Sequence, residues 1–224
     1  KNLDRLMTVV KSILITGASA GLGAALAHAL AAQGAQLTLM ARRADRLAQV
    51  VSACEQAGGK AQAIEGDVTR AEDGVRLTRA AIDAYGRVDG LIANAGLSMW
   101  ARFDEVKDLS VFRQLMEVNY LGAVHCLHPA LPHLKKSGGM FVAVSSIQGR
   151  IGVPHHTGYV ASKHALQGFC DALRMEVEQE GVGVLSVLLH WLRGTELREH
   201  AFGADGQKIG ASRRKHSSAS IGLE

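Results

Sequence analysis

The sequence predicts an α/β fold: a three-layer, doubly wound parallel sheet with strand order 3-2-1-4-5-6 and helices on both faces. Three observations favour this fold. Short apolar runs alternate with helical stretches six times along the chain. The first run leads into a glycine-rich turn and an alanine-rich helix. Polar residues follow the ends of several runs, and the ends of parallel strands meet at one edge of such a sheet.

The composition indicates one globular domain. Hydrophobic residues make up 47% of the 224 residues and aromatic residues 4%, with 25 Gly and 3 Pro, as is typical of α/β proteins. We expect a single domain over residues 1–202. Residues 203–224 are rich in Gly, Ser and basic side chains and lack the alternation of a seventh strand, so we expect a loose tail there.

The charge and the cysteines exclude several classes of protein. The net charge is +4, but Lys and Arg are spread along the chain except at 42–43 and 213–215, which favours a small phosphate-bearing ligand over nucleic acid. The three cysteines are far apart and indicate neither a disulfide framework nor a metal site. Glycines interrupt the apolar stretch at 13–40, so we expect no membrane association and a cytoplasmic location.

The first predicted strand, residues 9–16, runs directly into the turn TGASAGLG. Gly17 allows a sharp turn, and Gly21 and Gly23 remove side chains where backbone would approach a pyrophosphate. Free N–H groups at the start of the next helix favour an anion. The spacing GxxxGxG predicts dinucleotide binding, although a tight turn alone would also explain it. The predicted cofactor contacts of this turn are Gly17, Ser19, Gly21, Leu22 and Gly23.

The second strand, AQLTLMA, ends where an acidic residue would bind a ribose 2′-hydroxyl, but Ala41 stands there, followed by Arg42 and Arg43. Two guanidinium groups favour a 2′-phosphate, and therefore NADP(H) rather than NAD(H). The alternative is an ordinary basic start to the next helix. Arginines oppose the dipole at a helix N-terminus, so a bound anion explains them better.

The third strand, KAQAIEG, ends at Asp67 and Val68, which we predict to contact the cofactor. The Asp67 carboxylate is placed to accept a hydrogen bond from an adenine amino group. It is equally suited to cap a helix that begins near Thr69, and both roles are compatible. The fourth strand ends in small residues that let backbone lie against a cofactor. The predicted contacts there are Asn94, Ala95 and Gly96.

Asn119 is a polar residue amid apolar neighbours in the long helical region that follows. Either its amide stabilises a helix irregularity, or it holds a catalytic water with Lys163; we favour the water because Tyr159 and Lys163 are present. Three histidines in this region have no carboxylate or thiol partner at ligand spacing, so they are expected to be exposed or satisfied rather than metal ligands. They are His125, His128 and His133.

The stretch SSIQGRIGVPHHTGYVASK carries a candidate acid/base set. Tyr159 and Lys163 are four residues apart on a predicted helix, so both project from one face. The Lys163 ammonium is expected to favour the Tyr159 phenolate. Ser146, at the end of the fifth strand, is placed to hydrogen-bond a substrate oxygen. YxxxK alone is compatible with a solvated pair, but this context favours proton transfer at a carbonyl or carbinol.

With TGASAGLG, ANAG, Asn119, Ser146 and YVASK in this order, the chain resembles a short-chain dehydrogenase/reductase of the single-domain Rossmann type over roughly residues 8 to 190. The resemblance implies NADP(H)-dependent hydride transfer between a carbonyl and a secondary alcohol of a small molecule, with Tyr159 as general acid/base. It also implies that Lys163 binds the nicotinamide ribose and that the protein is a homodimer or homotetramer. The implied catalytic set is Asn119, Ser146, Tyr159 and Lys163.

After the sixth strand the chain departs from the family pattern. His190 and Trp191 stand where a Pro-Gly pair is usual, although Thr195 remains as the expected nicotinamide contact, and the usual seventh strand is missing. A non-catalytic nucleotide-binding regulator, or a C-terminally truncated inactive form, is therefore the alternative. We expect residues 97–102, 148–156 and those after His190 to line the substrate pocket.

Overall fold

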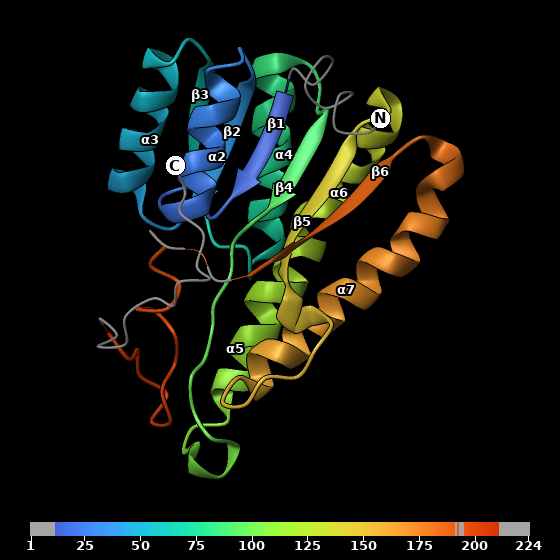
Figure 1. Cartoon of the computed structure of the whole chain (residues 1–224). Helices are drawn as coiled ribbons and strands as arrows, with labels where there is room; N and C mark the ends of the chain where they lie inside the picture. Colours follow the sequence, from blue (N-terminus) through green and yellow to red (C-terminus); the bar gives the residue numbers. More distant parts are fainter. Residues whose placement is uncertain (1–11, 191, 193–194, 211–224) are drawn as a thin grey trace.

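The structure is a computed structural model that describes residues 12–190, 192 and 195–210. Its six-stranded sheet has the order β3-β2-β1-β4-β5-β6 with every pair parallel, which confirms the predicted fold (Figure 1). The strands are β1 (Ser12–Thr16), β2 (Gln36–Ala41), β3 (Lys60–Glu65), β4 (Gly90–Ala93), β5 (Met140–Ser146) and β6 (Gly183–Leu189). The α-helices are α2 (Gly21–Ala31), α3 (Ala44–Gln56), α4 (Ala71–Tyr85), α5 (Ser110–Met116), α6 (Gly122–Ser137) and α7 (Thr157–Val177).

Short helical segments complete these elements. A π-helical turn, η2 (Glu117–Leu121), joins α5 to α6, so the long helical region expected there is interrupted at Asn119. Single 3₁₀ turns occur at η1 (Phe103–Glu105), η3 (Ile147–Gly149) and η4 (Glu178–Glu180). Residues 1–11, which include the start of the predicted first strand at 9–11, lie outside the described residues.

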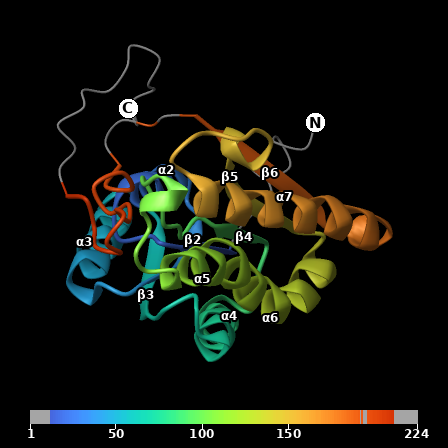
Figure 2. The ribbon, with the colours of Figure 1, turned by 90° about the horizontal axis from the view of Figure 1, so that it is seen from below.

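Two apolar cores sandwich the sheet, because side chains alternate between its faces along each strand. Ile13 and Ile15 of β1 pack with α2 and α3, whereas Leu14 between them belongs to the core beneath α4, α6 and α7. Figure 2 shows α2 and α3 on one side of the strands and α4 to α6 on the other. Strands β1 and β2 are almost wholly buried, which explains their nearly continuous apolar sequences.

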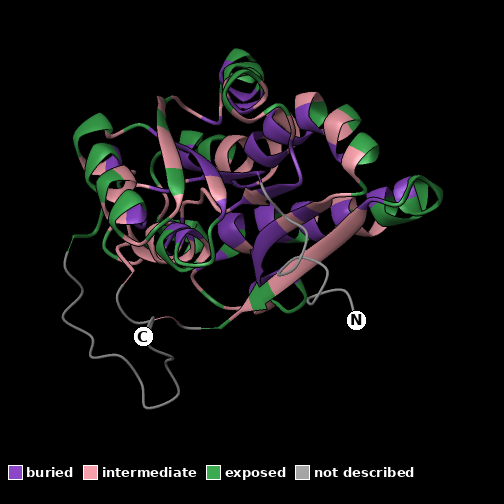
Figure 3. Cartoon of the chain, turned by 90° about the horizontal axis from the view of Figure 1, so that it is seen from above, coloured by how far each residue is buried: buried purple, intermediate pink, exposed green. Residues whose placement is uncertain are grey.

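Strand β6 is the edge of the described sheet and is only partly covered. Its residues have intermediate exposure apart from Leu188, which is 41% exposed (Figure 3). The core on the side of α2 and α3 draws its members from residues 13–61 and Ile92, so it ends at β4. Among the described residues, this core therefore does not extend to β5 and β6.

Residues 195–210 lie across the carboxyl edge of the sheet, where we had expected a loose tail from residue 203. Phe202 is buried, its N–H donates to the Ser98 carbonyl, and its own carbonyl accepts from Trp100. Ala204 accepts from the Lys107 N–H, which ties down the chain beyond 202. The structure thus differs from the expectation at 203–210. Residues 211–224, with the basic run at 213–215, lie outside the described residues.

The contact between α4 and α6 depends on Gly74, and this yields a first prediction. A Cβ at Gly74 would overlap the carbonyl oxygen of His125. We expect Gly74→Ala to lower the free energy of unfolding by roughly 1–3 kcal/mol, because the helices must move apart. In α7, a Cβ at exposed Gly168 meets nothing within 4 Å, so Gly168→Ala should instead stabilise by roughly 0.5–1 kcal/mol.

Urea unfolding of both variants tests whether Gly74→Ala lowers the free energy of unfolding and Gly168→Ala raises it. An unchanged midpoint for Gly74→Ala would contradict the close approach of α4 and α6 at this position.

Candidate active site

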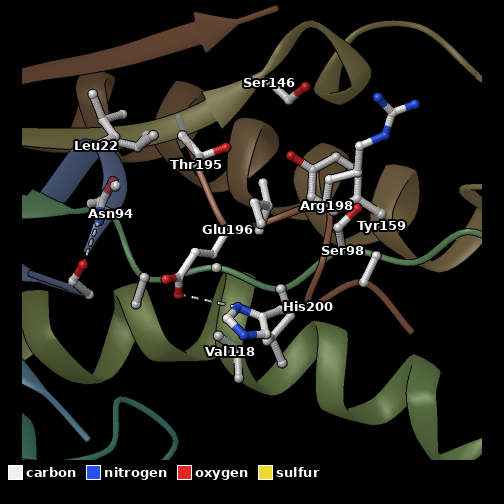
Figure 4. A pocket seen from close by; sticks show the side chains of 18 of the residues that line it. Leu22, Asn94, Ser98, Val118, Ser146, Tyr159, Thr195, Glu196, Arg198 and His200 are labelled. Carbon is white, nitrogen blue, oxygen red and sulfur yellow. Dashed lines mark hydrogen bonds and ion pairs between the residues drawn. The ribbon is translucent and has the colours of Figure 1, made fainter. Parts of the chain in front are cut away.

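A cavity of about 370 Å³ opens at the carboxyl edge of the strands and brings the predicted motifs together (Figure 4). Of the predicted site residues, only Gly23 and Asn119 do not line it. Those that do are Gly17, Ser19, Gly21, Leu22, Arg42, Arg43, Asp67, Val68, Asn94, Ala95, Gly96, Ser146, Tyr159, Lys163 and Thr195.

The glycine turn before α2 is shaped partly by protein packing. Gly17 and Gly21 adopt positive φ values of 64° and 54°, which favour glycine. A Cβ at Gly23 would overlap the Gly17 carbonyl oxygen and lie 2.6 Å from the Asn94 amide nitrogen. We had assigned Gly23 to the approach of a pyrophosphate. The structure shows that the turn itself already requires glycine there.

Thr16 and Asn94 join the ends of β1 and β4. The Asn94 Nδ2 donates to the carbonyls of Thr16 (3.0 Å) and Gly17 (3.2 Å). The Thr16 Oγ1 accepts from the N–H groups of Asn94 (3.0 Å) and Ala95 (3.1 Å). Sequence reasoning had treated residues 94–96 only as small residues and missed Thr16, whose signal was a hydroxyl at the end of an otherwise apolar strand.

Asp67 fixes a turn ahead of α4. Its Oδ1 accepts from both the N–H and the hydroxyl of Thr69, each at 3.0 Å. Helix α4 begins at Ala71, with Arg70 as its N-cap, so the alternative of a helix capped by Asp67 near Thr69 is wrong. Asp67 nevertheless lines the cavity, and its contact with adenine stays a prediction.

Glu196 is the anion that meets the arginines at the start of α3. The Arg43 Nη1 lies 3.1 Å from Glu196 Oε2, and the Arg46 Nη1 lies 2.7 Å from Oε1. Hydrogen bonds from Arg46 and Arg43 hold the pKa of the Glu196 carboxyl below its ordinary value. The Arg43 Nη2 also lies 3.4 Å from the Ser19 hydroxyl. The sequence suggested an anion here but not that the chain supplies one.

Asn119 holds three segments together. Its Oδ1 accepts from the Leu97 N–H (2.7 Å), and its Nδ2 donates to the Leu97 carbonyl and the Ser162 hydroxyl, both at 2.9 Å. Asn119 lies within the π-helical turn. This agrees with the alternative in which its amide stabilises a helix irregularity. A Cβ at Gly96 would lie 3.4 Å from Asn119 Oδ1 and 3.9 Å from Lys163 Nζ. The water between Asn119 and Lys163 stays a prediction.

Ser146, Tyr159 and Lys163 converge as the sequence predicted. Ser146, at the end of β5, donates to the Leu189 carbonyl (3.3 Å) and accepts from the Gln148 N–H (3.2 Å). Figure 4 shows the Ser146 and Tyr159 side chains on one wall of the cavity. The Lys163 Nζ donates to the Val144 carbonyl (2.9 Å) and lies 5.8 Å from the centre of the Tyr159 ring. Tyr159 and Lys163 are only 7% and 4% exposed. The alternative, in which they form a solvated pair on the helix surface, is therefore wrong.

Burial determines the protonation states of Tyr159 and Lys163. It raises the pKa of the Tyr159 phenol, and the neighbouring Ser146 hydroxyl offsets this only in part. Burial also lowers the pKa of Lys163 to about 8. We had expected the lysine to favour the phenolate. Desolvation outweighs that effect here, because both groups are enclosed, and the phenol keeps its proton at neutral pH.

The far wall of the cavity is built around Trp100. Its ring stacks on His155 (5.5 Å between centres) and meets the edge of His156 (4.8 Å). The Arg198 guanidinium lies 5.9 Å from the same ring. Burial lowers the pKa of His156. The sequence predicted these loops as pocket walls but gave no sign of this aromatic and cationic cluster.

Neither a metal cluster nor a membrane segment is found among the residues that the structure describes. No group of three or more His, Cys, Asp or Glu side chains there is placed to hold a metal ion, and no helix is both long and apolar enough to cross a membrane. The His125 Nδ1 lies 2.9 Å from the Val68 carbonyl, so this histidine is satisfied by backbone.

The fold and the site together define a Rossmann-type protein with a cavity suited to a dinucleotide and a Ser, Tyr and Lys set at one end. The family model for the short chain dehydrogenases matches residues 11–204. The chain belongs to this family.

Relatives and solved structures agree with that assignment. The chain is 40% identical over 178 residues to the 11-beta-hydroxysteroid dehydrogenase-like 4A of Arabidopsis thaliana, covering 79% of this chain and 59% of that protein. It is 31% identical over 216 residues to the dehydrogenase/reductase SDR family protein 7-like of Dictyostelium discoideum, covering 94% and 67%. The chain thus spans roughly three fifths of the length of the curated relatives it matches first.

Among solved structures, the chain is similar to the alcohol dehydrogenase from the archaeon Thermococcus sibiricus, whose structure is complexed with 5-hydroxy-NADP. The TM-score is 0.80 at 29% sequence identity, with 91% of this chain and 82% of that chain covered.

The burial of Lys163 predicts a pH-dependent stability. Its pKa of about 8 in the folded chain lies below the ordinary value of 10.5. Above pH 8 the folded state therefore releases this proton before the unfolded state does. The desolvation penalty is complete below pH 8 and is relieved as the pH rises to 10.5. We expect the wild type to gain up to roughly 3 kcal/mol relative to Lys163→Met between pH 7 and 10.5.

Denaturant unfolding of the wild type and of Lys163→Met between pH 7 and 10.5 measures the difference in their free energies of unfolding. Lys163→Met also loses the hydrogen bond to the Val144 carbonyl. This loss changes the difference in the free energy of unfolding by a constant amount and does not alter how that difference varies with pH. Lys60→Met, at an exposed position of β3, serves as the control and should show a flat difference. A flat difference for Lys163→Met would contradict a buried ammonium.

Proposed function

We propose that this chain catalyses the NADP(H)-dependent interconversion of a carbonyl and a secondary alcohol. The observation that carries the proposal is the placement of Ser146 and Tyr159 beside the buried Lys163, in a cavity that also reaches Arg42 and Arg43. The dehydrogenase names of the relatives and the NADP derivative bound to the archaeal structure support it.

The residues present fit a dinucleotide. Helix α2 begins after Ala20 with no side-chain cap and no acidic residue in its first turn, so its first N–H groups are suited to a pyrophosphate. Arg42, Arg43 and Ser19 would hold a 2′-phosphate at one end of the cavity. At the other end, Tyr159, Lys163 and Thr195 would hold the nicotinamide and its ribose. NAD(H) has no 2′-phosphate, so it would leave Arg43 with Glu196 and would make no such contact with Arg42; it is the less favoured cofactor.

The proton chemistry follows from the chain's own side chains. A bound nicotinamide supplies the hydride in reduction and accepts it in oxidation. The Ser146 hydroxyl holds the substrate oxygen, and Tyr159 donates its proton to that oxygen in reduction and takes it back in oxidation. Because burial raises the pKa of Tyr159, the proton to be donated is present at neutral pH. The Lys163 ammonium, fixed by the Val144 carbonyl, stabilises the phenolate that results.

We further propose a cytoplasmic homodimer or homotetramer that associates through the helices containing Asn119 and Tyr159. Sedimentation of the purified chain distinguishes these assemblies from a monomer.

The assignment of Tyr159 as general acid predicts a large loss of turnover in Tyr159→Phe. We expect kcat to fall by roughly 10²- to 10⁴-fold, because the phenyl ring has no proton to donate. Affinity for NADPH should fall far less, by no more than about tenfold, because only one neutral hydrogen bond to the cofactor is lost while Lys163, Thr195 and the ring remain. Turnover with a panel of carbonyl compounds and titration of nicotinamide fluorescence measure the two quantities.

Tyr120→Phe is the matched control: this tyrosine packs against Phe169 and does not line the cavity. It should retain full turnover. Full turnover in Tyr159→Phe would show that the proposed proton donor is wrong.

The assignment of the arginines predicts a selective loss of NADPH affinity. Replacing either Arg42 or Arg43 singly by Ala should weaken NADPH binding by roughly 10- to 100-fold, the value of one charge-assisted hydrogen bond, and NADH binding by less than about twofold. Arg79→Ala, which removes an exposed arginine of α4, controls for net charge. Equal weakening of both cofactors would argue against a 2′-phosphate site.

A further inference from the structure

Glu196 occupies the arginine cluster that the proposed function assigns to a 2′-phosphate. Its two carboxylate oxygens are divided between Arg43 (3.1 Å) and Arg46 (2.7 Å), and the His200 Nδ1 lies 3.8 Å from Oε2. Figure 4 shows Glu196 and His200 together within the cavity. The chain itself therefore provides an anion at this place.

The position of Glu196 is within the site and not beside it. Ser19, Arg43 and Glu196 all line the same cavity. The Arg43 guanidinium donates through Nη1 to Glu196 and approaches Ser19 through Nη2. A phosphate that binds Arg43 and Ser19 together would meet the Glu196 carboxylate. Two anions at one guanidinium repel one another, so they compete for Arg43.

The contact between Glu196 and Arg43 is of a kind that a ligand can displace. The side chains of Arg43, Arg46 and Glu196 are 39%, 43% and 35% exposed, so water screens their attraction. A phosphate monoester carries close to two negative charges at neutral pH, more than a carboxylate does. Displacement from Arg43 would leave Glu196 with Arg46, which binds the other oxygen.

We propose that Glu196 is an internal competitor for Arg43 and thereby a determinant of cofactor selectivity. A cofactor with a 2′-phosphate must displace the Glu196 carboxylate from Arg43, whereas a cofactor without this phosphate leaves the pair intact. The chain therefore binds NADPH less tightly than its arginines would allow. This inference rests on the proposed NADP(H) site.

A different role for Glu196 makes the opposite prediction. If the carboxylate served to orient Arg43 for the phosphate, its removal would weaken NADPH binding. Under competition, its removal strengthens NADPH binding. The sign of the change decides between the two.

The experiment titrates the full chain and its Glu196→Gln variant with NADPH and with NADH, following nicotinamide fluorescence. Glutamine keeps the size of the side chain and removes the charge. We expect NADPH to bind about fivefold more tightly to the variant, the factor that corresponds to the upper value of a partly exposed ion pair. NADH affinity should change by less than about twofold.

Glu199→Gln is the matched control. Glu199 lies three residues further along the same segment and is exposed, so its replacement makes the same change in net charge. It should leave both affinities unchanged. An equal gain in Glu199→Gln would assign the effect to the overall field and overturn the proposal.

A double variant tests whether the gain passes through Arg43. In an Arg43→Ala background, Glu196→Gln should no longer tighten NADPH binding, because the competed group is absent. Unchanged or weaker NADPH binding in Glu196→Gln alone would overturn the inference.

The outcomes for the two proposals differ. A wild type with no preference for NADPH would count against the proposed cofactor. If Glu196→Gln then acquired a preference that Arg43→Ala removed, the competition would still hold. Failure of every variant to bind either cofactor would overturn both proposals.

Discussion

The carboxamide of Asn119 is the interaction on which the geometry of the site depends. It is 2% exposed and makes three hydrogen bonds, to both backbone groups of Leu97 and to the Ser162 hydroxyl. The Ser162 hydroxyl in turn donates to the Tyr159 carbonyl in the same helix. Leaving such a buried group unpaired costs about 1–3 kcal/mol. The exit of β4, the π-helical turn and α7 are therefore held in one arrangement, which sets where Tyr159 and Lys163 face the cavity.

Enclosure by these segments also decides how the acid/base pair is charged. Desolvation disfavours the phenolate of Tyr159 and the ammonium of Lys163 alike, which raises the pKa of the first and lowers that of the second. The free chain thus holds a proton on the phenol, which suits donation to a carbonyl oxygen. In the oxidising direction of the proposed reaction the phenol would lose its proton, and the Lys163 ammonium, which is present below a pH of about 8, is the positive charge that would favour this loss.

The sequence was informative wherever a function depends on local spacing. Apolar runs and glycine turns predicted the strand order, and the four-residue separation of Tyr159 and Lys163 placed both on one helix face. The effect of burial on Tyr159 could not be predicted this way, because spacing along a helix does not reveal what packs over it. The packing role of Gly23 likewise arises from contact with Asn94, on another strand.

The ion pair between Arg43 and Glu196 joins residues that are 153 positions apart, and no pattern in the sequence predicts it. It depends on the path of residues 195–210 after β6, beyond the point where His190 and Trp191 replace the usual Pro-Gly pair. This segment places Thr195 beside Gly21, Glu196 at Arg43, and Phe202 in the apolar cluster that contains Met99 and Tyr159. One short segment therefore contacts both ends of the cavity. The lack of a Pro-Gly pair does not remove these contacts, so the departure from the pattern gives no physical reason to regard the site as disabled.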